Sequence, residues 1–243
     1  MSCAAYTDPR LAAVYDPLNP RGVEARFYEA QIGAAPRTLL EIGCGTGAFA
    51  VRLAELGHHV TGTDPAAEML NIARSRPGCE QVTWVESDAA SLSIGRKFDV
   101  AVMTGHVYQV FLTDDAVAAA LASIRSHLAP GGRLMFETRN PSACEWEIWT
   151  PDKTRERVSV PEVGEVGVHY NIKAVDGELV TFETVFQFAG NDIVRVDNTL
   201  RFMWAARVAD LLDYAGFYDV TWYGDWDGSN MRPGCPEIIV IAN

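Results

Sequence analysis

A short apolar run that ends in three closely spaced glycines constrains the fold of this chain more than any other feature. Residues 38–42 have the composition of a buried parallel strand, and Gly43, Gly45 and Gly47 follow it directly. An apolar helical stripe comes next and stops at Gly57. Glycines at such a junction let a ligand lie against bare backbone, beside the free N–H groups of the helix. The segment therefore predicts an α/β fold with a ligand site at this turn; a plain tight turn is the alternative.

Strands and helices alternate along the first 140 residues. Apolar runs predict strands over residues 38–42, 59–63, 81–86, 98–103 and 133–138. Helical patterns lie between these runs, including residues 65–74 and 114–128, and a helical lead-in covers residues 21–32. This alternation predicts a doubly wound parallel sheet with helices on both faces.

The pattern changes after Pro141. Residues 165–174, 178–188 and 193–203 have strand patterns joined by glycine-containing turns, which predicts an antiparallel β insertion. A helix over 205–214 and strands over 218–223 and 237–242 then resume the α/β pattern. We expect one domain in three parts, which are a helical cap and core over 1–140, the insertion over 141–203, and the completion of the core over 204–243.

Charge and cysteine content narrow the range of partners. The 32 acidic and 20 basic residues give a net charge of -12, which disfavours nucleic acid and anionic membranes as partners. The five cysteines are scattered without a CxxC pair, so neither a disulfide framework nor a zinc site is indicated. No signal peptide or transmembrane run is recognisable. We therefore expect a soluble, cytoplasmic protein.

The glycine turn by itself leaves two ligands open. Read from Gly43 to Ala48, it also fits the fingerprint of dinucleotide-binding folds, and Asp64 follows the second strand where an acid can hold ribose hydroxyls. Three further features distinguish between a dinucleotide and another ligand. They are Glu41 before the first glycine, an acidic loop at 87–89 after the third strand, and a Pro-Gly-Gly turn at 130–132 before the fifth strand.

With these features, residues 38–140 resemble the class I S-adenosylmethionine-dependent methyltransferases. Their Glu/Asp-x-Gly-x-Gly-x-Gly loop appears here as Glu41 to Gly47. The resemblance implies a Rossmann-like sheet of seven strands, the last one antiparallel. It also implies S-adenosyl-L-methionine as the cofactor and S-adenosyl-L-homocysteine as the product.

The resemblance further implies which residues bind the cofactor. The glycine loop would pack against its methionine part, Asp64 would hold both ribose hydroxyls, and Asp88 would accept from the adenine amino group. A helix N-cap and a solvated turn residue are the structural alternatives for these two acids. The complete expected set is Tyr15, Glu41, Gly43, Cys44, Gly45, Gly47, Asp64, Pro65, Met69, Asp88, Ala89 and Thr104.

The acceptor is expected at the same edge, because ligands of open α/β sheets bind outside the carboxyl ends of the strands. His106 follows the fourth strand, where related methyltransferases face the transferred methyl group, and is the candidate general base. A histidine that only caps the strand is the alternative. Residues expected around the acceptor are Tyr28, Tyr108, Arg139, Trp146, Tyr170 and Trp226.

These acceptor residues have structural alternatives too. The tryptophans could stack on a flat acceptor or form the core of the insertion, and Arg139 could bind an anionic group or pair with Glu137 or Glu145. Asp225 and Asp227 could hold a cationic amine or only form a turn. Between Met103 and Asp114 there is no acid, so the carboxylate cluster of metal-dependent catechol-type enzymes is missing and no metal is expected.

The sequence thus predicts a methyltransferase that acts on a small-molecule acceptor, with secondary metabolism suggested by an arginine-rich, lysine-poor composition. Met103 to His106 do not resemble the Asn/Asp-Pro-Pro-Tyr motif of enzymes that methylate adenine in DNA or glutamine in proteins. Cyclisation or cyclopropanation with the same cofactor, a non-catalytic cofactor-binding protein and, more distantly, a nicotinamide dehydrogenase are the alternatives. Edge strands in the insertion leave both a monomer and a homodimer open.

Overall fold

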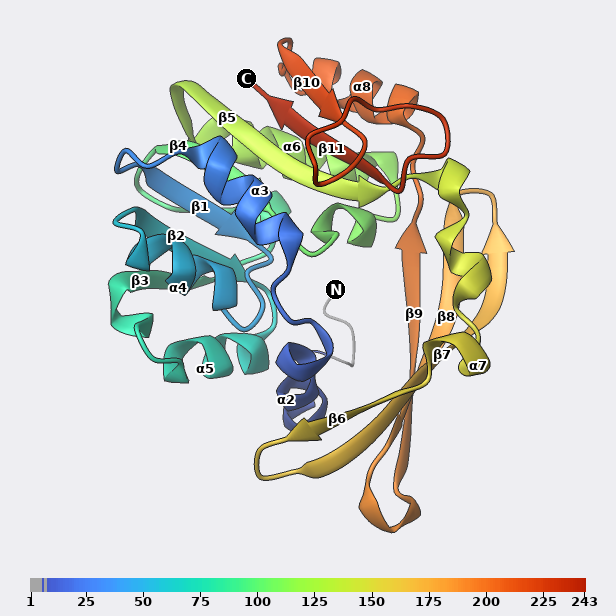
Figure 1. The fold of residues 1–243 in the computed structure, drawn as a ribbon. Coiled ribbons are helices and arrows are strands. Elements are labelled where there is room, and N and C mark those ends of the chain that lie inside the picture. The colour runs from blue at the N-terminus through green and yellow to red at the C-terminus, as the bar shows by residue number, and fades with distance from the viewer. Residues whose placement is uncertain (1–5, 7) are drawn as a thin grey trace.

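Two sheets organise the computed structural model, which describes Tyr6 and residues 8–243. The larger sheet has seven strands in the order β10-β11-β5-β4-β1-β2-β3, and the smaller has four in the order β6-β7-β8-β9. Figure 1 shows the smaller sheet beside the larger one, with helix α2 (Pro9–Leu18) between them. The doubly wound α/β fold predicted from the sequence is confirmed.

The larger sheet is parallel except for its last strand. Its strands are β1 (Thr38–Ile42), β2 (His59–Asp64), β3 (Val82–Glu86), β4 (Phe98–Met103), β5 (Leu128–Arg139), β10 (Val220–Tyr223) and β11 (Glu237–Ala242). Strand β11 runs antiparallel to both of its neighbours, and Glu237 lies opposite Arg139 of β5. The first residue of β11 therefore lies at the edge where the parallel strands end.

Helices cover both faces of this sheet. On one face pack α6 (Asp114–His127) and α8 (Ala205–Tyr214), and on the other α3 (Val23–Ile32) and α4 (Ala48–Glu55). Helix α5 (Ala67–Ser75) shares a small apolar cluster with α2. The remaining helical segments are short: η1 (Cys79–Gln81), η2 (Ala89–Ser91), η3 (Val107–Val110), η4 (Pro141–Ala143), η5 (Glu145–Ile148), α7 (Pro151–Thr154) and η6 (Ala189–Asn191).

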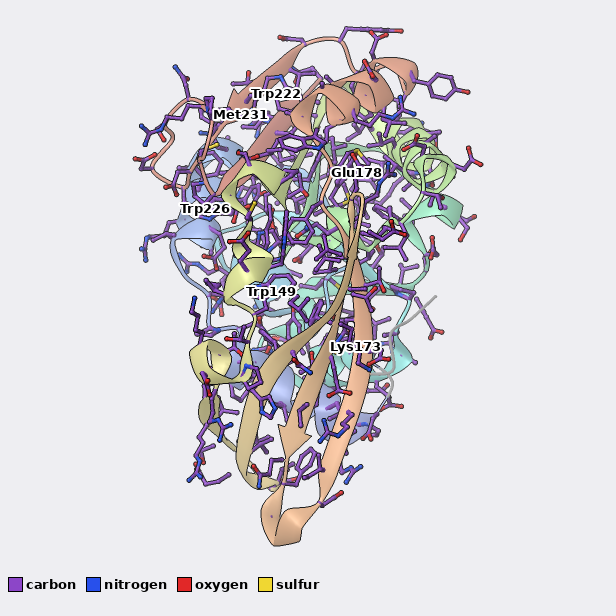
Figure 2. The ribbon with its side chains drawn as sticks, turned by 90° about the vertical axis from the view of Figure 1, so that its right-hand side faces the viewer. Trp149, Lys173, Glu178, Trp222, Trp226 and Met231 are labelled. Carbon is purple, nitrogen blue, oxygen red and sulfur yellow. The ribbon has the colours of Figure 1, made fainter. Side chains whose placement is uncertain are left out.

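The insertion forms an antiparallel sheet of β6 (Glu156–Val160), β7 (Gly164–Asp176), β8 (Leu179–Gln187) and β9 (Ile193–Arg201). The prediction of three strands there was incomplete, because β6 has only five residues and two apolar side chains, Val158 and Val160. Apolar side chains of the sheet pack partly on α2 and partly around Trp149. Figure 2 views the molecule from this side and labels Trp149, Lys173 and Glu178.

Within the described part of the chain, no helix is both long and apolar enough to cross a membrane. Among the same residues, no three His, Cys, Asp or Glu side chains are grouped as metal ligands.

Candidate active site

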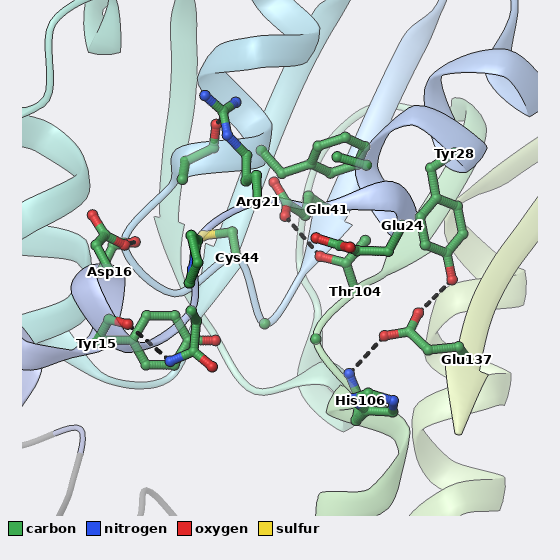
Figure 3. A pocket seen from close by; sticks show the side chains of 18 of the residues that line it. Tyr15, Asp16, Arg21, Glu24, Tyr28, Glu41, Cys44, Thr104, His106 and Glu137 are labelled. Carbon is green, nitrogen blue, oxygen red and sulfur yellow. Dashed lines mark hydrogen bonds between the residues drawn. The ribbon is translucent and has the colours of Figure 1, made fainter. Parts of the chain in front are cut away.

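A pocket of about 420 Å³ opens at the carboxyl ends of β1, β4 and β5. Figure 3 shows the acidic and aromatic side chains that converge on it from these strands and from α2 and α3. The pocket brings together nine of the residues expected from the sequence: Tyr15, Tyr28, Glu41, Gly43, Cys44, Thr104, His106, Arg139 and Trp226.

The glycine loop has a backbone that only glycine adopts easily. Gly43, Gly45 and Gly47 all have positive φ angles, of 67°, 53° and 75°. A Cβ atom on Gly47 would lie 2.4 Å from Trp84, and one on Gly43 would lie 2.6 Å from Val107. Val107 and Trp84 therefore already require glycine at positions 43 and 47, whether or not a ligand is bound.

Asp64 ties this loop to β2. One carboxylate oxygen accepts a hydrogen bond from the backbone N–H of Gly45 at 2.9 Å, and the other accepts from Ala66 at 2.8 Å. Helix α5 begins only at Ala67, so Pro65 lies before the helix rather than in its first turn. Each oxygen of Asp64 keeps a second lone pair, which suits a carboxylate that also holds ribose hydroxyls.

Glu41 is a buried carboxylate with an unsatisfied oxygen. Its Oε1 accepts from the Thr104 hydroxyl at 3.4 Å, whereas Oε2 has no hydrogen-bond partner among the described residues. Burial raises the pKa of Glu41 to about 8. An unpaired buried carboxylate is costly, and a cationic ligand would offset that cost. S-adenosylmethionine, which carries a sulfonium and an ammonium group, fits this requirement.

His106 is held at two points. It has a left-handed φ of 59°, and its backbone N–H donates to Glu137 Oε1 at 2.7 Å. The Tyr28 hydroxyl donates to the other oxygen of Glu137 (Figure 3). The imidazole Nε2 lies 3.0 Å and 3.1 Å from the two carboxylate oxygens of Glu237. A non-glycine residue with this φ is strained, and such strain often accompanies a functional site.

Burial also dominates the titration of the His106–Glu237 pair. It lowers the pKa of His106 to about 4, with the positive charge of Arg139 as the next cause, and it raises the pKa of Glu237 to about 8. The contact between the two groups opposes both shifts, because an imidazolium beside a carboxylate stabilises the charged form of each. His106 and Glu237 are therefore adjacent titratable groups, and the hydrogen between Nε2 and the carboxyl group belongs to the ring when Glu237 is ionised and to Glu237 when it is protonated.

Helix α2 closes the pocket on the side of the glycine loop. A Cβ atom on Gly45 would lie 3.9 Å from the ring of Tyr15. Asp16 accepts from the Thr46 hydroxyl at 2.5 Å and forms an ion pair with Arg76. These contacts fasten α2 to the segment that carries the cofactor motif.

Seven expected cofactor residues do not line the pocket. Four of them, Gly45, Gly47, Asp64 and Pro65, belong to the segments described above, and the other three are Met69, Asp88 and Ala89. Met69 is buried beside Ala66 and close to Tyr15, and its terminal methyl lies 3.3 Å from where a Cβ of Gly45 would be. Asp88 is exposed and accepts from the backbone N–H of Ala90 at 2.9 Å, and Ala89 begins η2. They remain expected contacts of the adenine end.

Three expected acceptor residues pack in apolar cores instead. Tyr108 is 2% exposed and stacks on Phe136 with ring centroids 4.4 Å apart, so it does not form the pocket wall. Trp146 packs on Phe202 at 4.6 Å, and Tyr170 packs within the same aromatic cluster of the insertion. Trp146 and Tyr170 thus lie in the core of the insertion, which is the structural alternative given for the aromatics there, whereas Tyr108 lies in the core of the larger sheet.

The charged candidates also have local partners. Arg139 lines the pocket but forms an ion pair with Glu145 at 3.0 Å and donates to Gln109 at 2.8 Å. Asp225 accepts from the N–H of the next residue, and Asp227 caps the N–H of Ser229 at 2.8 Å. Turn formation therefore accounts for both aspartates.

Five residues at the pocket were not predicted from the sequence: Glu137 and Glu237, which contact His106, and Asp16, Arg21 and Glu24 of the wall. A signal for Glu237 was present, because it opens an otherwise apolar strand that was expected to run antiparallel. The first residue of such a strand lies at the ligand edge of the sheet. Glu137 is similarly an acid near the end of a buried strand. Because acidic side chains are rarely buried without a partner, its position could have indicated a site residue.

Comparisons with known proteins agree with this geometry. The family described as Methyltransferase domain matches residues 39–132. The cypemycin N-terminal methyltransferase of a Streptomyces species is 31% identical over 106 residues, which are 44% of this chain and 43% of that protein. Nodulation protein S of Bradyrhizobium diazoefficiens is 30% identical over 145 residues, which are 56% of this chain and 68% of that protein. The chain thus spans less than half of the first relative and about two thirds of the second.

Solved structures show the same fold over almost the whole chain. The CcbJ methyltransferase of Streptomyces caelestis has a TM-score of 0.77 at 20% identity, covering 98% of this chain and 97% of that one. The SAM-bound amino pentose methyltransferase CalS10 of Micromonospora echinaspora has a TM-score of 0.68 at 22% identity, covering 95% of each chain. With the motif, the pocket and the curated relatives in agreement, this chain belongs to the family of S-adenosylmethionine-dependent methyltransferases.

Proposed function

We propose that this chain transfers a methyl group from S-adenosylmethionine to the nitrogen of a small-molecule amine, with His106 as the proton acceptor. The observation that carries the proposal is the surplus of acids in the pocket. Asp16, Glu24, Glu41 and Glu137 line it, together with Arg21 and Arg139. Asp16 is paired with Arg76 and Arg139 with Glu145, which leaves three acids against Arg21. Such a wall favours cationic and neutral ligands over anionic ones.

The named activities of two similar proteins support the same acceptor class. The cypemycin enzyme is named for methylation of an N-terminus, and CalS10 is named as an amino pentose methyltransferase. Each name refers to an acceptor that carries an amine. A natural-product amine is therefore the acceptor class that we test first.

S-adenosylmethionine supplies a methyl group on a sulfonium sulfur, and transfer of that methyl to an amine leaves a proton to be removed from the nitrogen. The residues around the glycine loop hold the cofactor: Glu41 offers its free oxygen to the positive charge, and Asp64 offers lone pairs to ribose hydroxyls. Helix α2 covers this part of the pocket and excludes water. Holding two reactants in line in this way supplies about 7–11 kcal/mol of the barrier.

His106 has the position and chemistry to take the proton. It lies at the end of β4 on the pocket wall, and burial keeps its imidazole neutral at physiological pH, since it lowers the pKa to about 4. A neutral imidazole is the form that accepts a proton. General-base assistance of this kind is worth about 10²- to 10⁴-fold in rate.

The test is a methyl-transfer assay with isotope-labelled S-adenosylmethionine and matched acceptor pairs, each an amine and the alcohol of the same shape. We expect label in the amine products and much less in the alcohols. His106→Ala is expected to reduce kcat about 10²-fold or more while leaving the affinity for S-adenosylhomocysteine unchanged. His59→Ala, which removes an exposed histidine at the opposite edge of the sheet, is the matched control with unchanged activity.

Three outcomes would overturn parts of the proposal. Methylation of the alcohols alone would exclude an amine acceptor. Products that lack an added methyl would favour cyclisation or cyclopropanation. Binding of S-adenosylhomocysteine without turnover on any acceptor would favour a cofactor-binding protein.

A further inference from the structure

Glu237 reaches His106 from a part of the chain far from the cofactor motif. It is 131 residues further along the sequence, and its carboxylate meets Nε2 at 3.0 Å. The antiparallel direction of β11 brings it there, opposite Arg139 at the carboxyl end of β5. Glu237 is only 7% exposed and is not among the described residues that line the pocket. It can therefore act on an acceptor only through His106.

The other contacts of His106 leave its ring with this single partner. Glu137 binds the backbone N–H and is itself held by the Tyr28 hydroxyl, so it fixes the main chain at the strained φ. The structure gives Nδ1 no hydrogen-bond partner among the described residues. One carboxylate thus anchors the backbone of His106 and a second anchors its ring.

We propose that Glu237 is a positioning residue that holds His106 in the tautomer with hydrogen on Nε2, which leaves the Nδ1 lone pair free to take a proton from the acceptor. The inference rests on the proposed role of His106 as proton acceptor. Which nitrogen carries the proton is set by the hydrogen bond that the other nitrogen makes. An ionised Glu237 accepts a hydrogen bond from Nε2–H and so selects the tautomer that can act as a base at Nδ1, whereas a protonated Glu237 would donate to Nε2 and select the opposite tautomer. In the proposed arrangement the contact with the imidazole therefore keeps Glu237 ionised near neutral pH.

The proton transfer balances without a further reactant. The N–H bond of the acceptor breaks, its electron pair stays on nitrogen, and the proton binds the lone pair of Nδ1. The imidazolium that forms keeps its Nε2–H on the Glu237 carboxylate, whose negative charge stabilises it. The other charged groups that act on this ring are Glu137 and Arg139 from β5, Glu24 from α3 and Glu145 from η5.

The decisive variant is Glu237→Gln, which keeps the size of the side chain and removes its charge. We expect kcat to fall about 10- to 100-fold, the magnitude typical for loss of a partner that orients a functional histidine. We expect KM to change by less than about threefold, because Glu237 does not touch the acceptor. The acid limb of the kcat/KM profile should move to lower pH by about one unit or more, because the carboxylate no longer stabilises the imidazolium.

Nuclear magnetic resonance reads the tautomer directly, without turnover. In protein labelled with ¹⁵N-histidine, long-range proton–nitrogen spectra should show His106 with hydrogen on Nε2 near neutral pH, and Glu237→Gln should reduce this form. The spectrum of His106→Gln assigns the signal. A wild-type spectrum with hydrogen on Nδ1, or an unchanged spectrum and pH profile in Glu237→Gln, would overturn the proposal.

The two proposals fail in different ways. Full activity of His106→Ala would remove the proton-acceptor role, although the spectra would still report the tautomer. Loss of activity in His106→Ala with an unaltered Glu237→Gln would remove only the role of Glu237. In the His106→Ala background, Glu237→Gln should have no further effect on kcat; a persistent loss would show a merely structural role. If Glu237→Gln does not fold, Glu237→Asp and the wild-type titration supply the same measurements.

Discussion

Buried acidic side chains have different kinds of partner in the two sheets of this chain. In the insertion, Glu183 lies between Lys173 and Arg195, at 3.3 Å and 2.7 Å. At the ligand edge of the larger sheet, Glu41 contacts a hydroxyl and Glu237 contacts an imidazole. The insertion neutralises its acid with permanent cations, whereas the active-site edge keeps acids whose charge can change.

This difference separates stability from function within one chain. A permanently paired acid gains stability from its partners but has no remaining capacity to bind a ligand. An unpaired buried acid lowers stability. It is tolerated where a ligand can pair with its charge or a proton can neutralise it. The following variants test this contrast, from the largest expected effect to the smallest.

Trp149→Ala should have the largest effect on stability and a small direct effect on cofactor binding. Trp149 is 6% exposed and packs on Phe182 at 4.8 Å and Phe202 at 5.8 Å. Its removal leaves a cavity that costs about 3–5 kcal/mol. Hydrogen exchange should rise in β7, β8 and β9 more than in β1 and β4. Trp226→Ala, which truncates a pocket aromatic, is expected to weaken acceptor binding and to cost less stability.

Gly47→Ala should be the most damaging change in the glycine loop. The new methyl would lie 2.4 Å from Trp84 at a residue with φ of 75°, so both packing and backbone oppose it. We expect a loss of about 2–4 kcal/mol in the free energy of unfolding, measured by denaturant titration. Gly177→Ala is the matched control, since that glycine also has a positive φ but open space among the described residues. Equal losses in both variants would mean that Trp84 does not limit the loop.

Glu41→Gln should stabilise the protein and weaken cofactor binding. Because burial raises the pKa of Glu41 to about 8 from an ordinary 4.5, the folded state binds more protons than the unfolded state between these values. The contribution of Glu41 to stability is therefore present below pH 4.5 and is lost as the pH rises through 8. At pH 8 the variant should be more stable than the wild type by about 1–3 kcal/mol, and the difference should disappear near pH 5.

The matched control for Glu41→Gln is Glu183→Gln. Desolvation raises the pKa of Glu183, but the bonds from Arg195 and Lys173 outweigh it and hold that pKa below its usual value. Its charged form is therefore the stabilising one, and Glu183→Gln should lower Tm slightly at neutral pH. Tm shifts of the same sign in the two variants would contradict the contrast between the sheets. Calorimetry with S-adenosylhomocysteine should show reduced affinity only for Glu41→Gln.

Asp16→Asn should have the smallest effect. It removes the charge that pairs with Arg76 and weakens the bond from the Thr46 hydroxyl, which together fasten α2 over the pocket. A partly exposed pair of this kind contributes about 0.2–1 kcal/mol. We therefore expect a roughly two- to fivefold weaker affinity for S-adenosylhomocysteine, mainly through faster dissociation in a stopped-flow experiment. Unchanged dissociation would show that α2 does not limit release of the product.

The sequence predicted the core because its signals are local. The run 38–42 matches β1 and the stripe that follows matches α4, since buried parallel strands and amphipathic helices each have a recognisable periodicity. The last strand, 237–242, was also placed correctly. Strand β6 was missed because a five-residue edge strand carries little pattern.

The site was harder to predict because its key contacts join distant segments. Spacing along the sequence predicted Glu41, Gly43 and His106, which line the pocket from the ends of β1 and β4. It could not identify Glu237 as the partner of His106, because that contact depends on the register between β11 and β5. Nor could it show that Tyr108, Trp146 and Tyr170 pack in cores, since an aromatic side chain near a strand end suits a pocket and a core equally well.

The antiparallel last strand also determines when His106 can gain its ring partner during synthesis of the chain. The glycine loop, Asp64 and His106 emerge from the ribosome long before Glu237. His106 and Glu237 are 131 residues apart in the sequence. Contacts of such long sequence separation form late in folding, because the intervening chain must first be ordered. A nascent chain can therefore assemble its cofactor loop early, but His106 gains its ring partner only when β11 docks against β5. Docking of the strand that closes the sheet is therefore also the step that completes the contacts of the His106 ring.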